Sequence, residues 1–420
     1  MRKIAAALLC LVLLAASGCA AASVQPAEHE ALTIAVASDL HYLSPSLTDN
    51  GVLFQAVVSG GDGKLMLDVE AVTEAFAEQM IGERPDLLIL CGDLSFNGER
   101  QSHLDLAAKL KRIEEAGVRV LVLPGNHDLN GAAARFEGES CEPVDGVDAA
   151  AFREIYADFG YREALSVDEL SGSYVFAPCS GLRILMLDTN SYAEDLFPEE
   201  SLSWLEKQMK QARREGAELI AVSHQNLLVH NGLFLFGYQI LNAERLETLL
   251  YGYGVRLNLS GHMHIQHAAK NKLTEVLTSP LPMPPCRCAL VRWERGSLVY
   301  EARSVDVTAW AASRGLTDEK YRDFEAYSRD FFRRTAYDKA LGRCLASGME
   351  RGTAERIAAC FADTNLAYFT GEPLDRDRLR DEIAFMEAQA ADFSSVYLRS
   401  ILEDEAPDPL TVVIREGESG

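Results

Sequence analysis

The sequence predicts an α/β fold of layered sheets and helices, followed by a helical unit. Five short runs rich in Val, Ile and Leu lie between residues 32 and 260, which is the composition of strands that are buried on both faces. Helical patterns lie between several of these runs, so strands and helices alternate along the chain, as they do in α/β layers. From about residue 318 the pattern changes and becomes helical only.

The expected strands and helices follow from these patterns. The strand-like runs are 32–38, 86–91, 118–124, 218–223 and 255–260, with a further strand pair at 289–293 and 297–302 around a Glu294-Arg295-Gly296 turn. The helical patterns cover 69–80, 103–115 and 202–214. Two insertions, 44–66 and 130–170, each follow polar motifs at strand ends, so both should border any site formed there.

Five short motifs of metal-ligand residues come directly after the five runs. They are Asp39-Leu40-His41, Gly92-Asp93, Gly125-Asn126-His127-Asp128, Ser223-His224 and Gly261-His262-Met263-His264. In open α/β sheets ligands collect beyond the carboxyl ends of the strands, so these motifs should converge on one pocket. Together they hold enough carboxylate, imidazole and amide groups to bind two divalent cations.

The local spacing suits that role. Alternate residues of an extended segment point to the same side, so His262 and His264 form one pair of neighbouring ligands and Asp39 and His41 form another. Glycine precedes three of the motifs and allows a sharp turn close to a metal or phosphate. A plain strand-ending turn would also need glycine. The donors are nitrogen and oxygen without thiolate, which favours Mn, Fe, Zn or Ni over Ca or Mg.

The order of these motifs resembles that of the calcineurin-like metallophosphoesterase superfamily over roughly residues 31–305, and is most similar to bacterial class III cyclic-nucleotide phosphodiesterases. The resemblance implies a four-layer α/β/β/α sandwich. It also implies two metal sites, with Asp93 bridging them. One metal would take Asp39, His41 and His264, and the other Asn126, His224 and His262.

In that family a metal-bridging hydroxide attacks the phosphate ester. The resemblance assigns His127 to the leaving oxygen, which it protonates or stabilises, and Asp128 to orienting His127. An imidazole is well suited to proton transfer near neutral pH. Asn97, Glu99 and the Asp188-Thr189-Asn190 turn are further candidates for supporting contacts, with plain solvent exposure as the alternative. His267 could line the cleft, but we expect a surface position for it.

The first residues predict an exported lipoprotein. Residues 1–18 have a basic start and an apolar stretch too short to span a bilayer, as in a secretory leader. Cys19 follows Gly18, which resembles a bacterial lipoprotein box and implies lipid attachment to Cys19 and an extracytoplasmic, membrane-anchored protein. The alternative is an ordinary leader with an incidental cysteine. Residues 19–30 would form a tether.

The remaining boundaries are a metallophosphoesterase domain at 31–310, a helical domain at 311–405 and a tail at 406–420. Aromatic residues at helical spacing, such as Tyr321, Phe324 and Tyr327, predict core positions in a unit of three or four helices that packs on itself or on the catalytic domain. The formal charge of −23 disfavours binding to a nucleic-acid polymer. Cys91 and Cys288 lie in strand patterns, as small buried hydrophobes do, and we expect no disulfide framework.

These features predict a dinuclear metal-dependent phosphodiesterase that acts on a small phosphoester. Two alternatives remain. One is a phosphomonoesterase or nucleotidase of the same fold. The other is a non-catalytic surface lipoprotein that binds a metal or ligand, which would not need the intact His127, Asp128 and Asp93.

Overall fold

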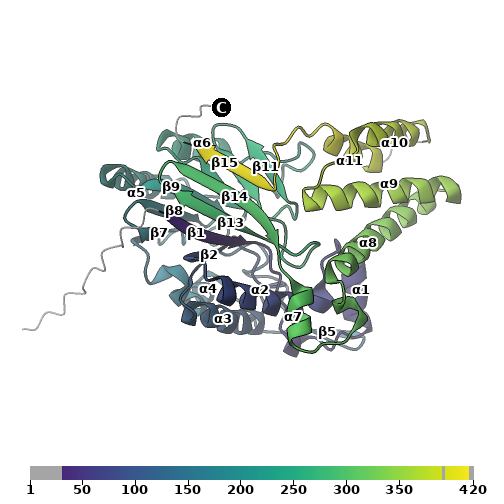
Figure 1. Ribbon diagram of the computed structural model, residues 1–420, viewed down its shortest axis with the longest axis horizontal. Coiled ribbons are helices and arrows are strands. Elements are labelled where there is room, and N and C mark those ends of the chain that lie inside the picture. The colour runs from purple at the N-terminus through teal and green to yellow at the C-terminus, as the bar shows by residue number, and fades with distance from the viewer. Residues whose placement is uncertain (1–30, 390–392, 416–420) are drawn as a thin grey trace, which may run out of the picture.

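The computed structural model describes residues 31–389 and 393–415, and its centre is a sandwich of two sheets (Figure 1). The first sheet has the strand order β15-β14-β13-β1-β2-β3 and the second the order β11-β12-β10-β9-β8-β7-β6. The strands of the first sheet are β1 (Ala31–Ala37), β2 (Leu87–Leu90), β3 (Arg119–Val122), β13 (Arg287–Glu294), β14 (Ser297–Ser304) and β15 (Thr411–Arg415). Those of the second are β6 (Ser166–Val167), β7 (Tyr174–Cys179), β8 (Leu182–Leu187), β9 (Glu218–Ser223), β10 (Leu257–Ser260), β11 (His267–Lys270) and β12 (Thr274–Leu277).

Helices cover the outer face of each sheet, which completes the expected four layers. The helices of the sandwich and its insertions are α1 (Val52–Gly60), α2 (Val69–Glu83), α3 (Arg100–Glu115), α4 (Ala149–Ile155), α5 (Ser201–Glu215) and α6 (Ala243–Gly252). Helices α2 and α3 pack on the first sheet, and α5 and α6 pack on the second. The prediction of an α/β/β/α sandwich is confirmed.

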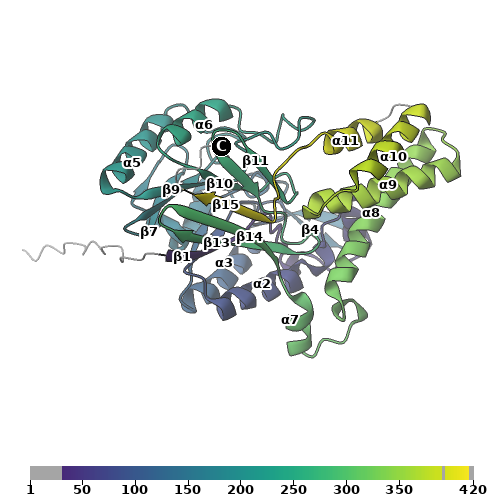
Figure 2. The ribbon, with the colours of Figure 1, turned by 45° about the horizontal axis from the view of Figure 1, so that its top comes forward.

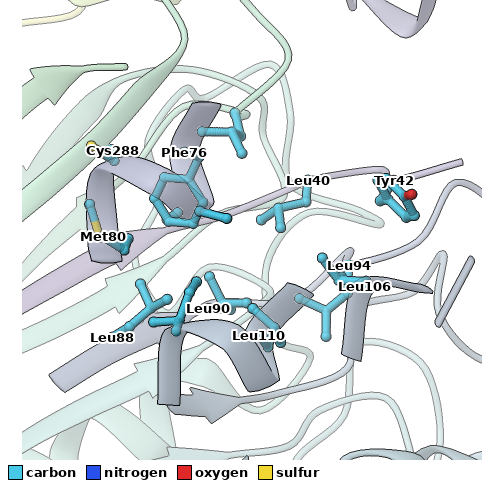
Figure 3. Close-up of a cluster of buried hydrophobic side chains, with 14 of the residues drawn as sticks. Leu40, Tyr42, Phe76, Met80, Leu88, Leu90, Leu94, Leu106, Leu110 and Cys288 are labelled. Carbon is cyan, nitrogen blue, oxygen red and sulfur yellow. The ribbon is translucent and has the colours of Figure 1, made fainter. Parts of the chain in front are cut away.

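The strands of this sandwich are buried on both faces because each face meets a different layer. Along β2, Leu87 and Ile89 point into the core between the sheets, while Leu88 and Leu90 point toward α2 and α3. Figure 3 shows the second of these cores, where Leu88 and Leu90 lie near Phe76 of α2 and the leucines of α3. Such strands have no polar face, which explains why the sequence shows continuous apolar runs.

Ligand-bearing strands lie side by side. β1 pairs in parallel with β2, and β2 with β3. In the second sheet β9 and β10 are also parallel neighbours. Their carboxyl ends therefore open on the same edge of the sandwich, where the five motifs follow.

A helical unit follows the sandwich, as predicted. It contains α7 (Val307–Ser313), α8 (Phe324–Ala346), α9 (Arg351–Thr370), α10 (Arg376–Gln389) and α11 (Phe393–Leu402). Figures 1 and 2 both show α8 to α11 projecting from one side of the sandwich. Its core contains Ile357, Ile383 and Leu398, and it extends to Met263 and Ile265 of the sandwich. None of the helices in residues 31–389 and 393–415 is long and apolar enough to cross a bilayer.

The end of the chain differs from the expected tail at 406–420. Thr411–Arg415 forms β15, which pairs antiparallel with β14 and extends the first sheet. The reason is the β-branched run Thr411-Val412-Val413-Ile414, which suits an edge strand. The helical unit is thus tied to the sandwich at both of its ends.

Two smaller elements complete the insertion at 130–170. Strands β4 (Ala134–Glu137) and β5 (Ser140–Pro143) form a hairpin, and α4 follows it. Phe136 of β4 packs with Phe54 of α1 and joins the two insertions in one small apolar cluster.

Candidate metal centre

Four carboxylate and imidazole groups meet beyond β1, β2 and β10. The ligand atoms of Asp39, His41, Asp93 and His264 all lie within 4.8 Å of one another. Nε2 of His41 is 3.1 Å from Nε2 of His264, which is itself 3.5 Å from Oδ1 of Asp39. These are the residues that the sequence assigned to one metal together with the bridging carboxylate.

A second group shares Asp93. It contains Asp93, His224 and His262, whose ligand atoms also lie within 4.8 Å of one another. Nε2 of His224 is 3.4 Å from Oδ1 of Asp93 and 3.1 Å from Oδ1 of Asn126. The structure therefore brings all seven proposed ligands together, and it places Asp93 in both groups.

The residues fit a pair of divalent cations. Oδ2 of Asp93 is buried and has no hydrogen-bond partner among the described residues, a costly state for a carboxylate oxygen unless a cation binds it. Other atoms hold the imidazoles in place. Nδ1 of His224 donates to the carbonyl of Cys91, and Nδ1 of His264 lies 2.7 Å from Oδ2 of Asp62. Such contacts leave Nε2 of His224 and of His264 for a metal.

The backbone of the site is strained. Asp39, His41, Asp93, His262 and His264 all have positive φ, between 44° and 70°. Non-glycine residues rarely adopt this region, and clusters of such residues occur where the surrounding structure imposes them at functional sites. The motif residues thus leave strand geometry at once and turn their side chains toward one centre.

Two glycines are required by close approach. A Cβ at Gly261 would lie 1.8 Å from Oγ of Ser38 and 2.3 Å from Oδ2 of Asp39. A Cβ at Gly125 would lie 2.2 Å from Oδ1 of Asp93. The expectation that these glycines leave room beside the ligands is confirmed.

Neighbouring charges hold the carboxylates of Asp39 and Asp93 ionised, because they lower the pKa of both. Burial opposes ionisation of Asp93, but the nearby His224 outweighs it and lowers the pKa of Asp93 well below its usual range. The same pairing overcomes the burial of His224 and raises its pKa to about 9. At His262 burial dominates, with help from the charge of His224, and lowers the pKa to about 4. The cluster therefore holds negative charge that a cation can neutralise.

His127 lies beside these groups. Its backbone N–H donates to Oδ1 of Asp93, and its ring is 4.9 Å from that of His41. Nδ1 of His127 contacts two acceptors, the carbonyl of Phe96 at 3.0 Å and Oδ1 of Asn97 at 2.8 Å. Nδ1 must therefore carry a proton, and Nε2 is the atom left for exchange.

The expectation that Asp128 orients the His127 ring needs correction. The Asp128 carboxylate accepts hydrogen bonds from the backbone of Leu94, Ser95 and Gly125, and from the Ser95 hydroxyl. It joins the loops after β2 and β3. The orienting side chain of His127 is Asn97 instead, and the sequence indicated it only as one possible supporting residue.

Asn190, one of the predicted supporting residues, is half-buried beside the site. The side chain of Asn190 exchanges two hydrogen bonds with that of Gln225, the residue after His224: Nδ2 of Asn190 donates to Oε1, and Oδ1 accepts from Nε2. Nδ2 of Asn190 also donates to the carbonyl of Pro124. Glu99 is fully buried, and burial raises its pKa to about 7. His103 lies in the first turn of α3 and contacts the carbonyl of Asp128.

His267 is not at the surface as expected. Its side chain is 6% exposed, and it contacts His230 and Asp404. The sequence could not show this because the partner Asp404 belongs to the helical unit.

The two sheets, the ligand motifs at their edge and the carboxylate shared by two ligand groups define the class of metal-dependent hydrolases. The family model of calcineurin-like phosphoesterases matches residues 32–266, and the chain belongs to this family. A second model, the C-terminal domain of cyclic nucleotide phosphodiesterase, matches residues 306–408.

Comparison with solved structures gives distant likenesses. A dimetal phosphatase from Danio rerio is 12% identical, with a TM-score of 0.48, and the match covers 65% of this chain and 96% of that one. The protein GAP50 of Plasmodium, described as the anchor in the inner membrane complex, is 12% identical at a TM-score of 0.38, covering 66% and 85%. A predicted phosphoesterase from Streptococcus pneumoniae is 14% identical at 0.29, covering 66% and 92%. No curated protein matches the chain.

The predicted leader, its lipid-attachment residue Cys19 and the tether lie outside the described residues. Cys91 and Cys288, expected as small buried hydrophobes, are buried thiols in the core.

Proposed function

We propose that the protein hydrolyses phosphodiesters at this centre, with two divalent cations, Mn, Fe, Zn or Ni, as cofactors. The observation that carries the proposal is Asp93, a buried carboxylate shared by two ligand groups. Bound cations about 3.5–4 Å apart would polarise the phosphoryl oxygens and make a water acidic enough to attack at neutral pH.

The residues of the chain have separate tasks in this reaction. Asp93 and the ligands on either side would fix the spacing of the two cations. His127 has its proton on Nδ1, held by Asn97 and Phe96, so its Nε2 can exchange a proton with the oxygen of the leaving group. As an imidazolium it would donate the Nε2 proton as the phosphorus–oxygen bond breaks.

A diester is the preferred substrate class. The model that matches residues 306–408 is named for cyclic nucleotide phosphodiesterases, which supports diester hydrolysis. A lipid anchor on Cys19 would place the site outside the cytoplasmic membrane, whereas cyclic nucleotides are mainly cytosolic. We therefore favour an external nucleotide, a glycerophosphodiester or a cell-wall precursor. Monoester hydrolysis by the same centre is the alternative.

Hydrolysis of bis-p-nitrophenyl phosphate and p-nitrophenyl phosphate tests this proposal. Protein loaded with Mn²⁺ should cleave the diester faster than the monoester. The variant Asp93→Ala should lose both metal binding and turnover. Asp338→Ala changes an exposed aspartate on α8 and is the matched control. A metal-loaded wild type no faster than Asp93→Ala would instead indicate a binding protein without catalysis.

The anchor is tested separately. Cys19→Ser in the producing cell should abolish incorporation of labelled fatty acid and release the protein from the membrane fraction. Continued acylation of the variant would contradict the assignment of Cys19.

A further inference from the structure

The insertion at 44–66 carries two charged residues to the metal centre. Nζ of Lys64 is 3.4 Å from Nε2 of His41, and Oδ2 of Asp62 is 2.7 Å from Nδ1 of His264. Lys64 and Asp62 also form an ion pair at 3.4 Å. Neither residue follows a strand, and neither belongs to the five motifs.

We propose that Lys64 binds the phosphoryl group of the substrate and that Asp62 positions the metal ligand His264, both held in place by helix α8. The proposal rests on the phosphoesterase function proposed above and adds two residues to it. It also gives the helical unit a task, which is to fix the loop that carries them.

Asp62 has the geometry of a positioning residue. A metal-binding histidine commonly donates its second ring N–H to a carboxylate, which fixes the tautomer and orientation of the ring. Asp62 accepts from Nδ1 of His264 and so directs Nε2 toward Asp39 and His41.

Lys64 has the geometry of an anion-binding residue. Its side chain is only 14% exposed, so the ammonium group stays at the metal centre and does not sample many conformations in solvent. Lys64 and a divalent cation would compete for Nε2 of His41, because both are positively charged. With a cation on His41, the donors of Lys64 would be free for phosphoryl oxygens, which accept strong charge-assisted hydrogen bonds.

Helix α8 holds this loop from the side. Nζ of Lys339 donates to the carbonyl of Gly61, and a Cβ at Gly63 would lie 2.6 Å from the ring of Phe332. Gly63 has φ of +97°, so the chain turns there in a way that other residues avoid. Figure 1 shows α8 beside α1, the helix that leads into the loop. The other end of the loop is fixed where Leu65 donates to the carbonyl of Pro282.

Metal affinity is the first test, because the two neighbours should act in opposite directions. Asp62→Ala should weaken Mn²⁺ binding by about 10- to 100-fold, since the orientation of His264 is lost. Lys64→Met should strengthen Mn²⁺ binding several-fold, since a competing positive charge is removed. Asp62→Asn keeps one acceptor oxygen and should recover part of the loss. Calorimetric titration of the full chain with Mn²⁺ measures the affinity of all three variants. Equal affinities in wild type, Asp62→Ala and Lys64→Met would overturn the assignment.

Phosphate binding is the second test. Inorganic phosphate should bind Mn²⁺-loaded Lys64→Met about 10- to 100-fold more weakly than wild type, and Lys64→Arg should restore much of the affinity. Lys210→Met, which changes a half-exposed lysine paired with Glu206 on α5, is the matched control. Unchanged phosphate affinity in Lys64→Met would overturn the role of Lys64.

The third test concerns the contacts by which α8 holds the loop of Asp62 and Lys64. Lys339→Ala combined with Phe332→Ala should weaken phosphate binding in the same direction, but by less than Lys64→Met. Full phosphate affinity in that variant would show that α8 does not hold the loop. Both calorimetric measurements are independent of turnover. An inactive wild type would therefore refute the proposed function while the roles of Lys64 and Asp62 could still be decided.

Discussion

Within the described residues, two clusters of histidine and carboxylate side chains can be compared, and they differ in how many of their polar atoms have hydrogen-bond partners. One is the metal centre. The other, which we call the interface network, consists of His230, His267, Glu275 and Asp404. Nδ1 of His230 is 2.8 Å from Nδ1 of His267, whose Nε2 is 2.7 Å from Oδ2 of Asp404. The network links the second sheet to the helical unit.

The carboxylates show the difference. Glu275 accepts hydrogen bonds from the backbone of Leu227 and Leu228 and from the side chains of His230, Asn258 and Ser260. Asp93, by contrast, keeps Oδ2 without a hydrogen-bond partner in the described part of the chain. The backbone of the metal centre is strained at five ligands, whereas no residue of the network has a positive φ.

This difference separates a structural cluster from a functional one. Residue types alone do not identify a metal site, because both clusters contain histidine and acid. Buried acceptor atoms without a hydrogen-bond partner, on a strained backbone, indicate a site that binds a ligand. Saturated acceptors indicate a cluster whose task is to hold the structure together.

The largest expected effect separates proton transfer from metal binding within the metal centre. His127→Ala should lower turnover by about 10²- to 10⁴-fold, because no side chain remains to exchange a proton with the leaving oxygen. Metal content, measured by mass spectrometry, should stay at the wild-type level. Loss of both metals in this variant would make His127 a ligand and contradict its assignment.

The interface network should respond in stability. Glu275→Ala leaves several buried donors without an acceptor and should cost about 3–5 kcal/mol of unfolding free energy. Asp93→Ala should cost less stability in metal-free protein, because it removes the ion pair with His224 and one hydrogen bond from His127 but also a buried carboxylate oxygen that has no hydrogen-bond partner. Chemical unfolding in the presence of a chelator measures both, with Glu139→Ala on the exposed β4–β5 turn as control. Equal losses in the two variants would remove the distinction between the clusters.

Glu99 sharpens the comparison, because it has an unpaired buried oxygen but belongs to neither metal group. Burial raises its pKa from 4.5 to about 7. Between these values the folded protein binds more protons than the unfolded chain, so stability should fall as the pH rises from 4.5 to 7. Glu99→Gln has no such titration.

The variant should therefore be more stable than wild type at pH 8, by on the order of 3 kcal/mol, and nearly equal to it at pH 4.5. Denaturant unfolding at both pH values decides this. A gain at pH 8 that persists unchanged at pH 4.5 would assign the effect to packing instead of ionisation.

The smallest effect concerns the metals themselves. Mn²⁺ at a hundredfold excess over its dissociation constant should stabilise the wild type by about 2.7 kcal/mol per site. It should not stabilise Asp93→Ala, although the interface network is intact there. Thermal unfolding with and without Mn²⁺ measures the shift, and an equal shift in both proteins would place the metal elsewhere.

Several features of the site followed from the sequence because they are local. Asp39, Asp93 and His224 come directly after buried apolar runs, and the parallel arrangement of such strands places their carboxyl ends on one edge. The DxH and HxH motifs predicted which residues meet, but the alternation of an extended segment does not hold there, because positive φ at Asp39, His41, His262 and His264 turns these side chains. The glycines before the motifs could also be understood from local geometry.

Other features depended on contacts between distant segments. Asp62 and Lys64 lie in an insertion without strand periodicity, and their place at the metal centre depends on α8, which follows more than 200 residues later. The Asp128 carboxylate binds backbone N–H groups of another loop, and those groups have no signature in the side-chain sequence. His267 is buried only because Asp404 and the helical unit cover it.

The sequence by itself determined the layered fold, the five ligand motifs and the helical character of the chain from about residue 318 to residue 405. These depend on periodicity and on residues next to one another, which a linear pattern records. The tertiary structure alone decided which atoms meet: the shared position of Asp93, the partner of His127, the loop held by α8 and the return of β15 to the first sheet. Such contacts join segments far apart in the chain, and their geometry depends on how the layers pack.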